Sequence, residues 1–293
     1  MSVKSRRGVF ILILALLVPT SCGAPTVTSQ SDPAPSPTDF ARSPSKDQLY
    51  EGTGLVLDDG DPLICFGGST DSAPPQCEGP ELRGWTWDGL EFDEMAGTKW
   101  GRFTVRGTYV DRVFTLKGIP TEPKPYEEGS SKSPCPEPAG GWSIPDPSRT
   151  SEEDRLSATR AAESQPDFAG AWIDYIVEPQ TEEEALAGEN VALILAFTGD
   201  AERHEDEARE HWGGALCIWT NNRTYKDLKR IQEELGGGWP EEFGIETTWS
   251  GIDIKAGMVE LGAIISTPAF EAELGERYGE NAVKVHPALQ PVG

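Results

Sequence analysis

Val191-Ala-Leu-Ile-Leu-Ala-Phe197 is apolar at every position. A strand with one wet face alternates apolar and polar residues, so a run that is apolar on both faces predicts a strand at the centre of a sheet. Gly199 and Asp200 begin an acidic helix that we expect to end at Gly213-Gly214, and Ala215-Leu-Cys-Ile-Trp219 is the next buried strand. Strands are therefore predicted to alternate with helices around this run.

The same alternation extends in both directions. A helix capped near Ser151 and a strand over residues 171–177 are expected before the run. After it, Thr224-x-x-Asp227 resembles a capping box and opens a helix that Gly236 ends. The remaining predicted elements are a hairpin of strands 246–255 and 258–265, a helix opened by the cap and first-turn pair Thr267-Pro268, and a last strand over 283–289.

This order of elements predicts one domain over residues 151–293. It is expected to be a two-layer α/β sandwich, and its final α-β-β-α-β part looks ferredoxin-like. No internal repeat is visible in the sequence.

The preceding region, residues 50–119, predicts a small β domain. Phe103, Val105 and Gly107 alternate with polar neighbours, which is the period of a strand with one wet face. Five short strands in this region suggest a small barrel, and an OB-like fold is one form it could take. The predicted strands are residues 54–57, 62–65, 82–87, 102–109 and 112–117. The predicted fold class of the whole chain is α+β.

The N-terminus predicts export. A basic start and an unbroken apolar run over residues 9–18 precede Pro19-Thr-Ser-Cys22. Ten apolar residues span about 15 Å as a helix, about half of a bilayer core, so residues 1–21 are interpreted as a signal peptide. The stretch before Cys22 resembles the bacterial lipobox, although Pro19 stands where Leu is usual, and it predicts a lipid on Cys22. Ordinary cleavage after Ala24 is the alternative.

Two stretches rich in proline are expected to lie outside the domains. Residues 22–49 have few large apolar side chains and are predicted to be a disordered tether. Residues 120–150 contain eight prolines and are interpreted as an interdomain linker that Cys135 cross-links partway along.

Five cysteines leave one unpaired in an oxidising compartment, and the lipid-bearing Cys22 is the natural odd one. The other four allow three pairings. We favour Cys65 with Cys77, because they bracket one turn-rich loop, and Cys135 with Cys217. A metal site on these thiols is disfavoured because none of the spacings is C-x-x-C.

The charge balance argues against some partners. With 49 acidic and 25 basic residues the formal net charge is −24, which repels nucleic acid and leaves no basic patch for anionic lipid. Solubility in a cation-rich exterior explains such a surface. We expect a monomer that touches the membrane through its lipid alone.

Several groups could carry chemistry, and each has a simpler interpretation. His204 and His211, with Glu207 between them, could hold zinc, but seven residues separate the imidazoles by about 10 Å, so a solvated helix face is favoured. His286 has no identifiable base beside it and is interpreted as structural. Asp58-Asp-Gly-Asp61 lacks the further ligands of a calcium loop and predicts a turn.

The remaining motifs are aromatic or absent. Trp85 and Trp87 would share one side of a strand and could form a glycan-binding face, but filling of the barrel core is favoured. The chain contains neither a G-x-x-x-x-G-K-[ST] phosphate loop nor a G-x-S-x-G elbow, which disfavours nucleotide and serine-hydrolase chemistry.

The run from Cys65 through Pro-Pro-Gln-Cys77-Glu-Gly-Pro-Glu-Leu-Arg-Gly-Trp-Thr-Trp87 resembles the uncharacterised exported lipoproteins of actinobacteria. Phe197-Thr-Gly-Asp200, Trp212-Gly-Gly-Ala-Leu-Cys217 and Val259-Glu-Leu-Gly262 extend the resemblance over most of the mature chain. The resemblance implies the cell envelope and two domains, and it implies no activity.

These patterns predict a membrane-anchored extracytoplasmic lipoprotein, a non-enzymatic binding module for a protein or cell-wall partner, with no cofactor and no metal. One alternative is an exported hydrolase with an unrecognised acidic or metal-assisted site. Another is an inhibitor of secreted serine proteases, because the hairpin over residues 251–265 is similar to their inhibitory pro-segments. No catalytic residue can be assigned from the sequence.

Overall fold

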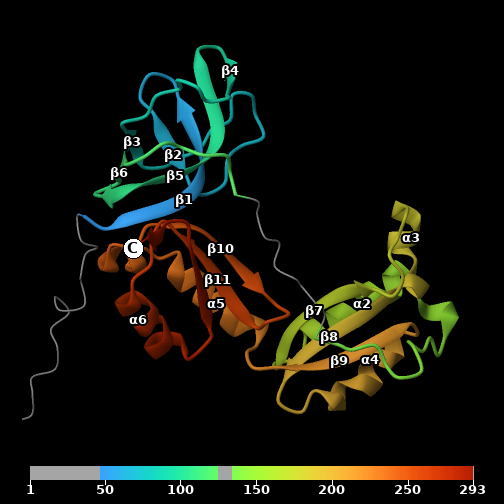
Figure 1. Cartoon of the computed structure of the whole chain (residues 1–293). Coiled ribbons are helices and arrows are strands. Elements are labelled where there is room, and N and C mark those ends of the chain that lie inside the picture. The colour runs from blue at the N-terminus through green and yellow to red at the C-terminus, as the bar shows by residue number, and fades with distance from the viewer. Residues whose placement is uncertain (1–46, 125–133, 293) are drawn as a thin grey trace, which may run out of the picture. The chain divides into compact units, whose positions relative to one another are not determined.

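A computed structural model of the chain describes residues 47–124 and 134–292, which form an α+β structure with three sheets (Figure 1). The signal segment, Cys22 and the predicted tether as far as residue 46 lie outside these residues, as does part of the linker. Leu49, the last residue of the predicted tether, is the first residue of a strand. In the described ranges no helix has both the length and the apolar character needed to cross a bilayer.

The first sheet is a closed barrel with additional edge strands. Its strands are β1 (Leu49–Asp58), β2 (Leu63–Cys65), β3 (Glu81–Arg83), β4 (Asp93–Met95), β5 (Thr98–Val110), β6 (Val113–Leu116) and β13 (Gln290–Val292). The barrel closes in the order β1-β2-β3-β6-β5 because β1 pairs with β5 along its full length, and β3 is parallel to β6. The predicted five-stranded barrel is confirmed, whereas β4 and β13 had no signal in the sequence.

The barrel core follows from the strand period. Phe103 and Val105 of β5 are buried in one cluster with Val56, Ile64 and Phe114. On the other face of β5, Arg102 and Arg106 are exposed, whereas Thr104 is buried with its hydroxyl 2.7 Å from that of Thr53. One predicted strand was too long, because β3 ends at Arg83 and Gly84 follows with φ +79°. Trp85 and Trp87 therefore lie in the loop after the strand and not on it.

The second sheet belongs to repeat 1, which we define as residues 151–221. Its elements are α2 (Glu152–Glu163), β7 (Phe168–Tyr175), α3 (Glu182–Leu186), η2 (Gly188–Asn190), β8 (Val191–Thr198), η3 (Glu202–His204), α4 (Glu205–His211) and β9 (Ala215–Asn221), preceded by η1 (Pro147–Arg149). The strand order is β7-β8-β9, with β7 antiparallel and β9 parallel to β8. The apolar run from Val191 to Phe197 is confirmed as the buried central strand.

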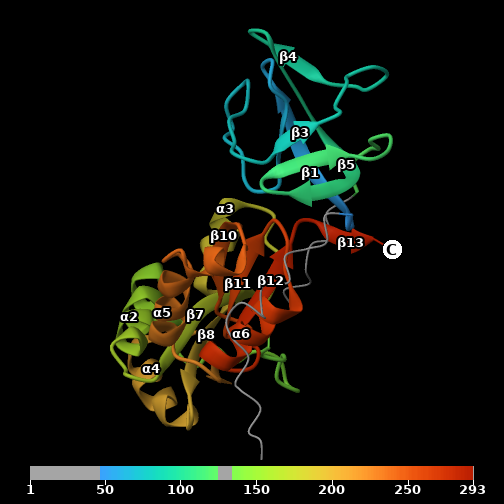
Figure 2. The same ribbon diagram turned by 90° about the vertical axis from the view of Figure 1, so that its left-hand side faces the viewer.

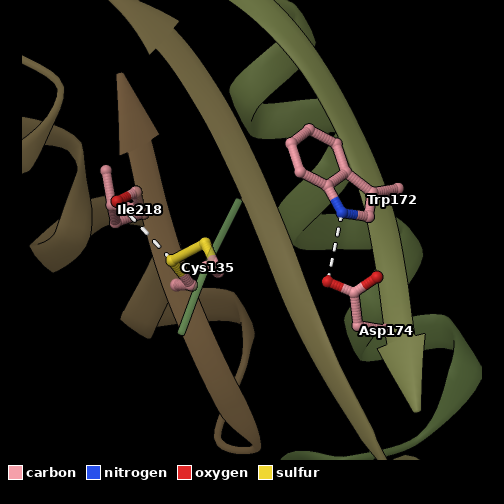
Figure 3. Close-up of a disulfide and its surroundings, with 5 residues drawn as sticks. Cys135, Trp172, Asp174 and Ile218 are labelled. Carbon is pink, nitrogen blue, oxygen red and sulfur yellow. Dashed lines mark hydrogen bonds between the residues drawn. A yellow bond between two sulfur atoms is a disulfide. The ribbon is translucent and has the colours of Figure 1, made fainter. Parts of the chain in front are cut away.

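Both faces of this sheet are covered. Val191, Leu193, Leu195 and Phe197 pack with the alanines of α2 and α4. The opposite face, which includes Ile194, packs against Cys135 and Trp142 of the segment 134–146. Figure 3 shows the disulfide of Cys135 and, across the central strand, Trp172 with its indole N–H directed to Asp174.

The third sheet belongs to repeat 2, defined as residues 224–287 (Figure 2). Its elements are α5 (Tyr225–Leu235), η4 (Trp239–Phe243), β10 (Thr247–Asp253), β11 (Met258–Ala263), α6 (Pro268–Tyr278) and β12 (Val283–Pro287). The order is β10-β11-β12, with β10 antiparallel and β12 parallel to β11. Helices α5 and α6 bury Leu228, Ile231 and Phe270 in the same hydrophobic cluster as Val259 and Leu261 of β11.

The prediction of one sandwich with a ferredoxin-like end is wrong in its topology. Residues 151–287 form two three-stranded sheets, not one. A split βαβ unit keeps another strand between its two parallel strands, but β11 and β12 are direct neighbours joined through α6. The order α-β-β-α-β was predicted correctly, and the pairing of its last strand was not.

The two repeats share one backbone plan although the sequence shows no repetition. Each has a helix capped by Ser or Thr with Asp three residues later, and each has a register shift early in its first strand, between Phe168 and Gly170 and between Thr247 and Trp249. The registers thus make Gly170 and Ala196 equivalent to Trp249 and Gly262.

Candidate functional site

The most promising site in the described residues is a cleft beside Glu246 with a volume of about 420 Å³. We call it the Glu246 cleft. It is lined by the end of β5 and the β5–β6 turn, by the end of η4, and by the residues that flank β10 and α6. The lining residues are Tyr109, Val110, Asp111, Arg112, Glu241, Phe243, Gly244, Ile245, Glu246, Ile265 and Thr267.

Local backbone chemistry places the rim of the cleft. Asp111 and Arg112 form a two-residue hairpin turn between Val110 and Val113, and their φ values of 49° and 61° are those of a type I′ turn. On the other side, Gly244 has φ 69° and ends η4. Such a conformation favours glycine, and it turns the chain into β10 just after Glu241 reaches the rim.

Glu246 is held by two partners from the barrel. The Tyr109 hydroxyl donates to its Oε2 at 3.1 Å, and Arg112 Nη2 lies 3.0 Å from its Oε1. Burial, followed by the nearby charge of Glu246, raises the pKa of Tyr109 well above its usual range, so the phenol stays protonated and donates. Both carboxylate oxygens are thus engaged.

The cleft has the lining of a binding site. Ile245 and Ile265 are buried in its floor, while Asp111 and Glu241 are exposed on its rim. Among the described lining residues there is no cysteine, histidine, serine or lysine, and the Thr267 hydroxyl accepts the Phe270 N–H as a helix cap. On the rim, Asp111 and Glu241 outnumber the exposed Arg112, whose charge is paired with Glu246. An apolar floor with this net acidic rim suits a cationic group carried on an aliphatic stem.

The carboxylate that corresponds to Glu246 in repeat 1 is Asp167. Each residue precedes the first strand of its repeat, and each carbonyl accepts a backbone N–H at 2.9 Å, from Thr198 to Asp167 and from Ile264 to Glu246. Asp167 binds Arg203 Nη2 at 2.7 Å and His204 Nε2 at 3.0 Å. Burial would raise the pKa of Asp167, but the hydrogen bonds from His204 and Arg203 outweigh it and the pKa is lowered.

The predicted solvated face for His204 and His211 is wrong for His204. Its side chain is 7 % exposed and its ring stacks on Phe197 with centroids 3.9 Å apart. His211 Nδ1 lies 3.1 Å from the Ser157 hydroxyl. The two imidazoles have different partners, and within the described part of the chain no cluster of three or more histidine, cysteine or acidic side chains could hold a metal ion.

The cysteines pair as predicted. Cys65 is joined to Cys77 and Cys135 to Cys217, with Cα–Cα distances of 6.1 and 6.4 Å. Cys22, the expected site of lipid, lies outside the described residues.

The acidic turn and the two tryptophans also follow the simpler interpretations. Asp58 caps the predicted turn by accepting the Gly60 N–H, and its other oxygen accepts the Trp87 indole N–H at 2.7 Å. Trp85 and Trp87 pack on Phe103 with ring centroids 5.1 and 5.9 Å away. They close the barrel core, as favoured over a glycan-binding face.

The interpretation of His286 needs correction. A carboxylate does lie beside it, because His286 Nε2 is 3.1 Å from Glu260 Oε1, and the ring of Trp249 lies next to it. No local sequence pattern predicts this group, since Glu260 and His286 meet only through the parallel pairing of β11 with β12. Tyr109, Arg112 and Glu246 were missed for a similar reason.

Other carboxyl groups in the described chain give little support to acid–base catalysis. Side-chain hydrogen bonds from Arg83, Ser148 and Arg230 lower the pKa of Glu81, Asp146 and Glu234 respectively. A general acid at neutral pH needs a raised pKa, so these groups are unsuited to that role.

Searches of protein-family models, curated proteins and solved structures find no match to the chain.

Proposed function

We propose that this protein is a lipid-anchored extracytoplasmic binding module of the actinobacterial cell envelope, without enzymatic activity. The N-terminal pattern that ends at Cys22 supports the anchor. Two disulfides among the remaining four cysteines are consistent with an oxidising compartment.

The observation that carries the binding role is the Glu246 cleft. Tyr109, Arg112 and Glu246 satisfy one another, the floor of the cleft is apolar, and the described lining contains no cysteine, serine or histidine. Its acidic rim favours a basic side chain, from a partner protein or from the peptide part of the cell wall. Affinity for such a group should fall as salt rises, because the rim is exposed.

The test uses two neighbouring glutamates of η4. Glu241 lines the cleft, whereas Glu242 is also exposed on the same short helix and does not line it. We expect Glu241→Lys to lower recovery of a crosslinked partner from intact cells by about tenfold or more, as for loss of a charged contact. Glu242→Lys, the control, should leave recovery unchanged. Equal recovery with both variants would exclude the cleft as the binding site.

The anchor is tested separately. Mass spectrometry of the mature protein should find Cys22 as a lipid-modified N-terminal residue. Recovery of the intact N-terminus from cytosol would refute both the anchor and the proposed compartment.

We further propose that the barrel is OB-like. Support comes from the ring order β1-β2-β3-β6-β5 with β3 parallel to β6, a Greek-key closure of five strands. The loop that contains Trp85 and Trp87 lies in the connection between β3 and β5, the third and fourth barrel strands in chain order.

The two alternatives have weaker support. A hydrolase needs a reactive group, and the shifted carboxyl groups above are charged and hydrogen-bonded. The hairpin likened to a protease-inhibitory segment has its turn engaged within the chain, since Lys255 Nζ lies 3.2 Å from Asp174 Oδ1 and the side chain of Ile254 packs against Gly170.

A further inference from the structure

The second face of the β10-β11-β12 sheet, opposite α5 and α6, carries an exposed tryptophan. Register pairs Trp249 with Gly262 and Gly262 with His286, so all three lie on one face, with Glu260 one pleat away. We call Trp249, Glu260, Gly262 and His286 the Trp249 platform. The described residues leave 44 % of Trp249 exposed.

Glycine makes this geometry possible. A Cβ at position 262 would overlap with the indole, which therefore lies flat across the backbone of β11. The His286 ring is 5.5 Å from the Trp249 ring at an interplanar angle of 31°, and it is held by Glu260. The backbone at Gly262 and the ring of His286 thus support the indole, while 44 % of Trp249 stays exposed.

Repeat 1 shows what the same face looks like when it is permanently covered. Positions equivalent to Glu260, Lys284 and His286 are Ile194, Cys217 and Trp219 by the shared registers. Those side chains pack against the segment 134–146, and Cys217 is cross-linked to Cys135 within it.

Repeat 2 replaces that apolar set by a carboxylate, an ammonium group and an imidazole, and it places an indole, that of Trp249, where repeat 1 has Gly170. An apolar cover would leave these polar groups without water, at a cost in free energy. The face therefore suits a ligand that has one apolar side and many hydroxyl groups.

We propose that the Trp249 platform binds a neutral saccharide. The C–H side of a pyranose ring stacks on an exposed indole, and its hydroxyl groups donate to Glu260 and accept from the exposed Lys284. This site is separate from the Glu246 cleft, and the inference does not require a partner in that cleft.

In the experiment, the mature full-length protein is titrated with three neutral hexasaccharides and binding is measured by calorimetry. The sugars are hexamers of β-1,4-linked N-acetylglucosamine, of β-1,4-linked glucose and of α-linked mannose. At least one should bind, and Trp249→Ala should weaken that binding at least tenfold. Phe92→Ala, which removes an exposed aromatic ring of the barrel, is the control and should bind as the wild type does. Far-ultraviolet circular dichroism checks that each variant is folded.

A pair of glycine variants tests the geometry without removing the indole. Gly262→Ala should displace Trp249 and weaken binding, whereas Gly251→Ala should not, since a Cβ there would lie 3.9 Å from the indole. The proposal is overturned if no hexasaccharide binds, if Trp249→Ala binds normally, or if a proline-rich peptide binds the platform in place of the sugars.

Discussion

Repeat 1 and repeat 2 have the same order of helices and strands, the same strand pairing and the same early register shift, yet their second faces differ. In repeat 1 that face is apolar and lies under the segment 134–146. In repeat 2 it is polar and carries an exposed tryptophan. One backbone plan thus forms a covered structural unit at one position in the chain and leaves an open polar face at another.

The equivalent carboxylates, Asp167 and Glu246, also differ between the two repeats in how far they are enclosed. Asp167 is bound by Arg203 and His204 of its own repeat, whereas Glu246 is bound by Tyr109 and Arg112 of the barrel. The first carboxylate is enclosed and the second borders a cleft. Ligand sites are therefore expected in repeat 2, and stability determinants in repeat 1.

The largest effect is predicted for removal of the disulfide that fixes the segment 134–146 to repeat 1. Replacing Cys135 and Cys217 together by serine opens a loop with a sequence separation of 82 residues, which the chain-entropy model values at about 4.5 kcal/mol of unfolding free energy. Chemical denaturation measures the loss. Tryptophan emission should shift to longer wavelength as the face that contains Trp172 becomes wet.

The Cys65–Cys77 pair is the matched control. Its separation of 12 residues predicts a smaller loss of about 3 kcal/mol, without the change in emission from repeat 1. If the Cys135–Cys217 variant lost less stability than this control, the segment 134–146 would not be a determinant of the folded state.

The next effect concerns the enclosed carboxylate. Asp167→Asn keeps the shape but weakens the bonds from Arg203 and His204, and we expect a loss of about 1 to 3 kcal/mol in unfolding free energy near pH 7. Because the pKa of Asp167 is lowered on folding, its contribution is present above the pKa of the unfolded chain, about 4, and is lost as pH falls further.

Unfolding curves of wild type and Asp167→Asn should therefore converge below about pH 4. Glu246→Gln, the equivalent change in repeat 2, should cost less, since the side chain of Glu246 is 27 % exposed and water can replace its partners. Equal losses from the two variants would contradict the distinction between an enclosed and an open carboxylate.

Local signals in the sequence predicted the elements well. The helix caps at Ser151, Thr224 and Thr267 mark the starts of three helices, and the alternation around Phe103 marks a barrel strand. These signals succeed because each depends on residues a few positions apart, where propensity and hydrogen bonding act directly.

The candidate sites could not be predicted in this way. Tyr109 and Glu246 are 137 residues apart, and Glu260 meets His286 only once β12 pairs with β11. Repetition was hidden as well, because equivalent positions such as Ile194 and Glu260 differ in chemistry while the backbone hydrogen bonds agree. Knowledge of strand pairing, which a single sequence does not supply, would have revealed both the sites and the repetition.

The smallest predicted effect tests the link between the barrel and Glu246. Tyr109→Phe removes one hydrogen bond to the carboxylate and should cost about 0.5 to 1.5 kcal/mol of unfolding free energy at pH 7. The pKa of Tyr109 is raised on folding, so the contribution is complete below the unfolded pKa of about 10 and declines as pH rises above it. The unfolding free energy of the wild type should thus approach that of the variant in strong alkali.

Tyr175→Phe, at an exposed position, is the control and should change the unfolding free energy by less than about 0.5 kcal/mol both at pH 7 and in alkali. A Tyr109 variant as stable as this control would mean that Glu246 is held by Arg112 alone and that the cleft does not depend on the phenol.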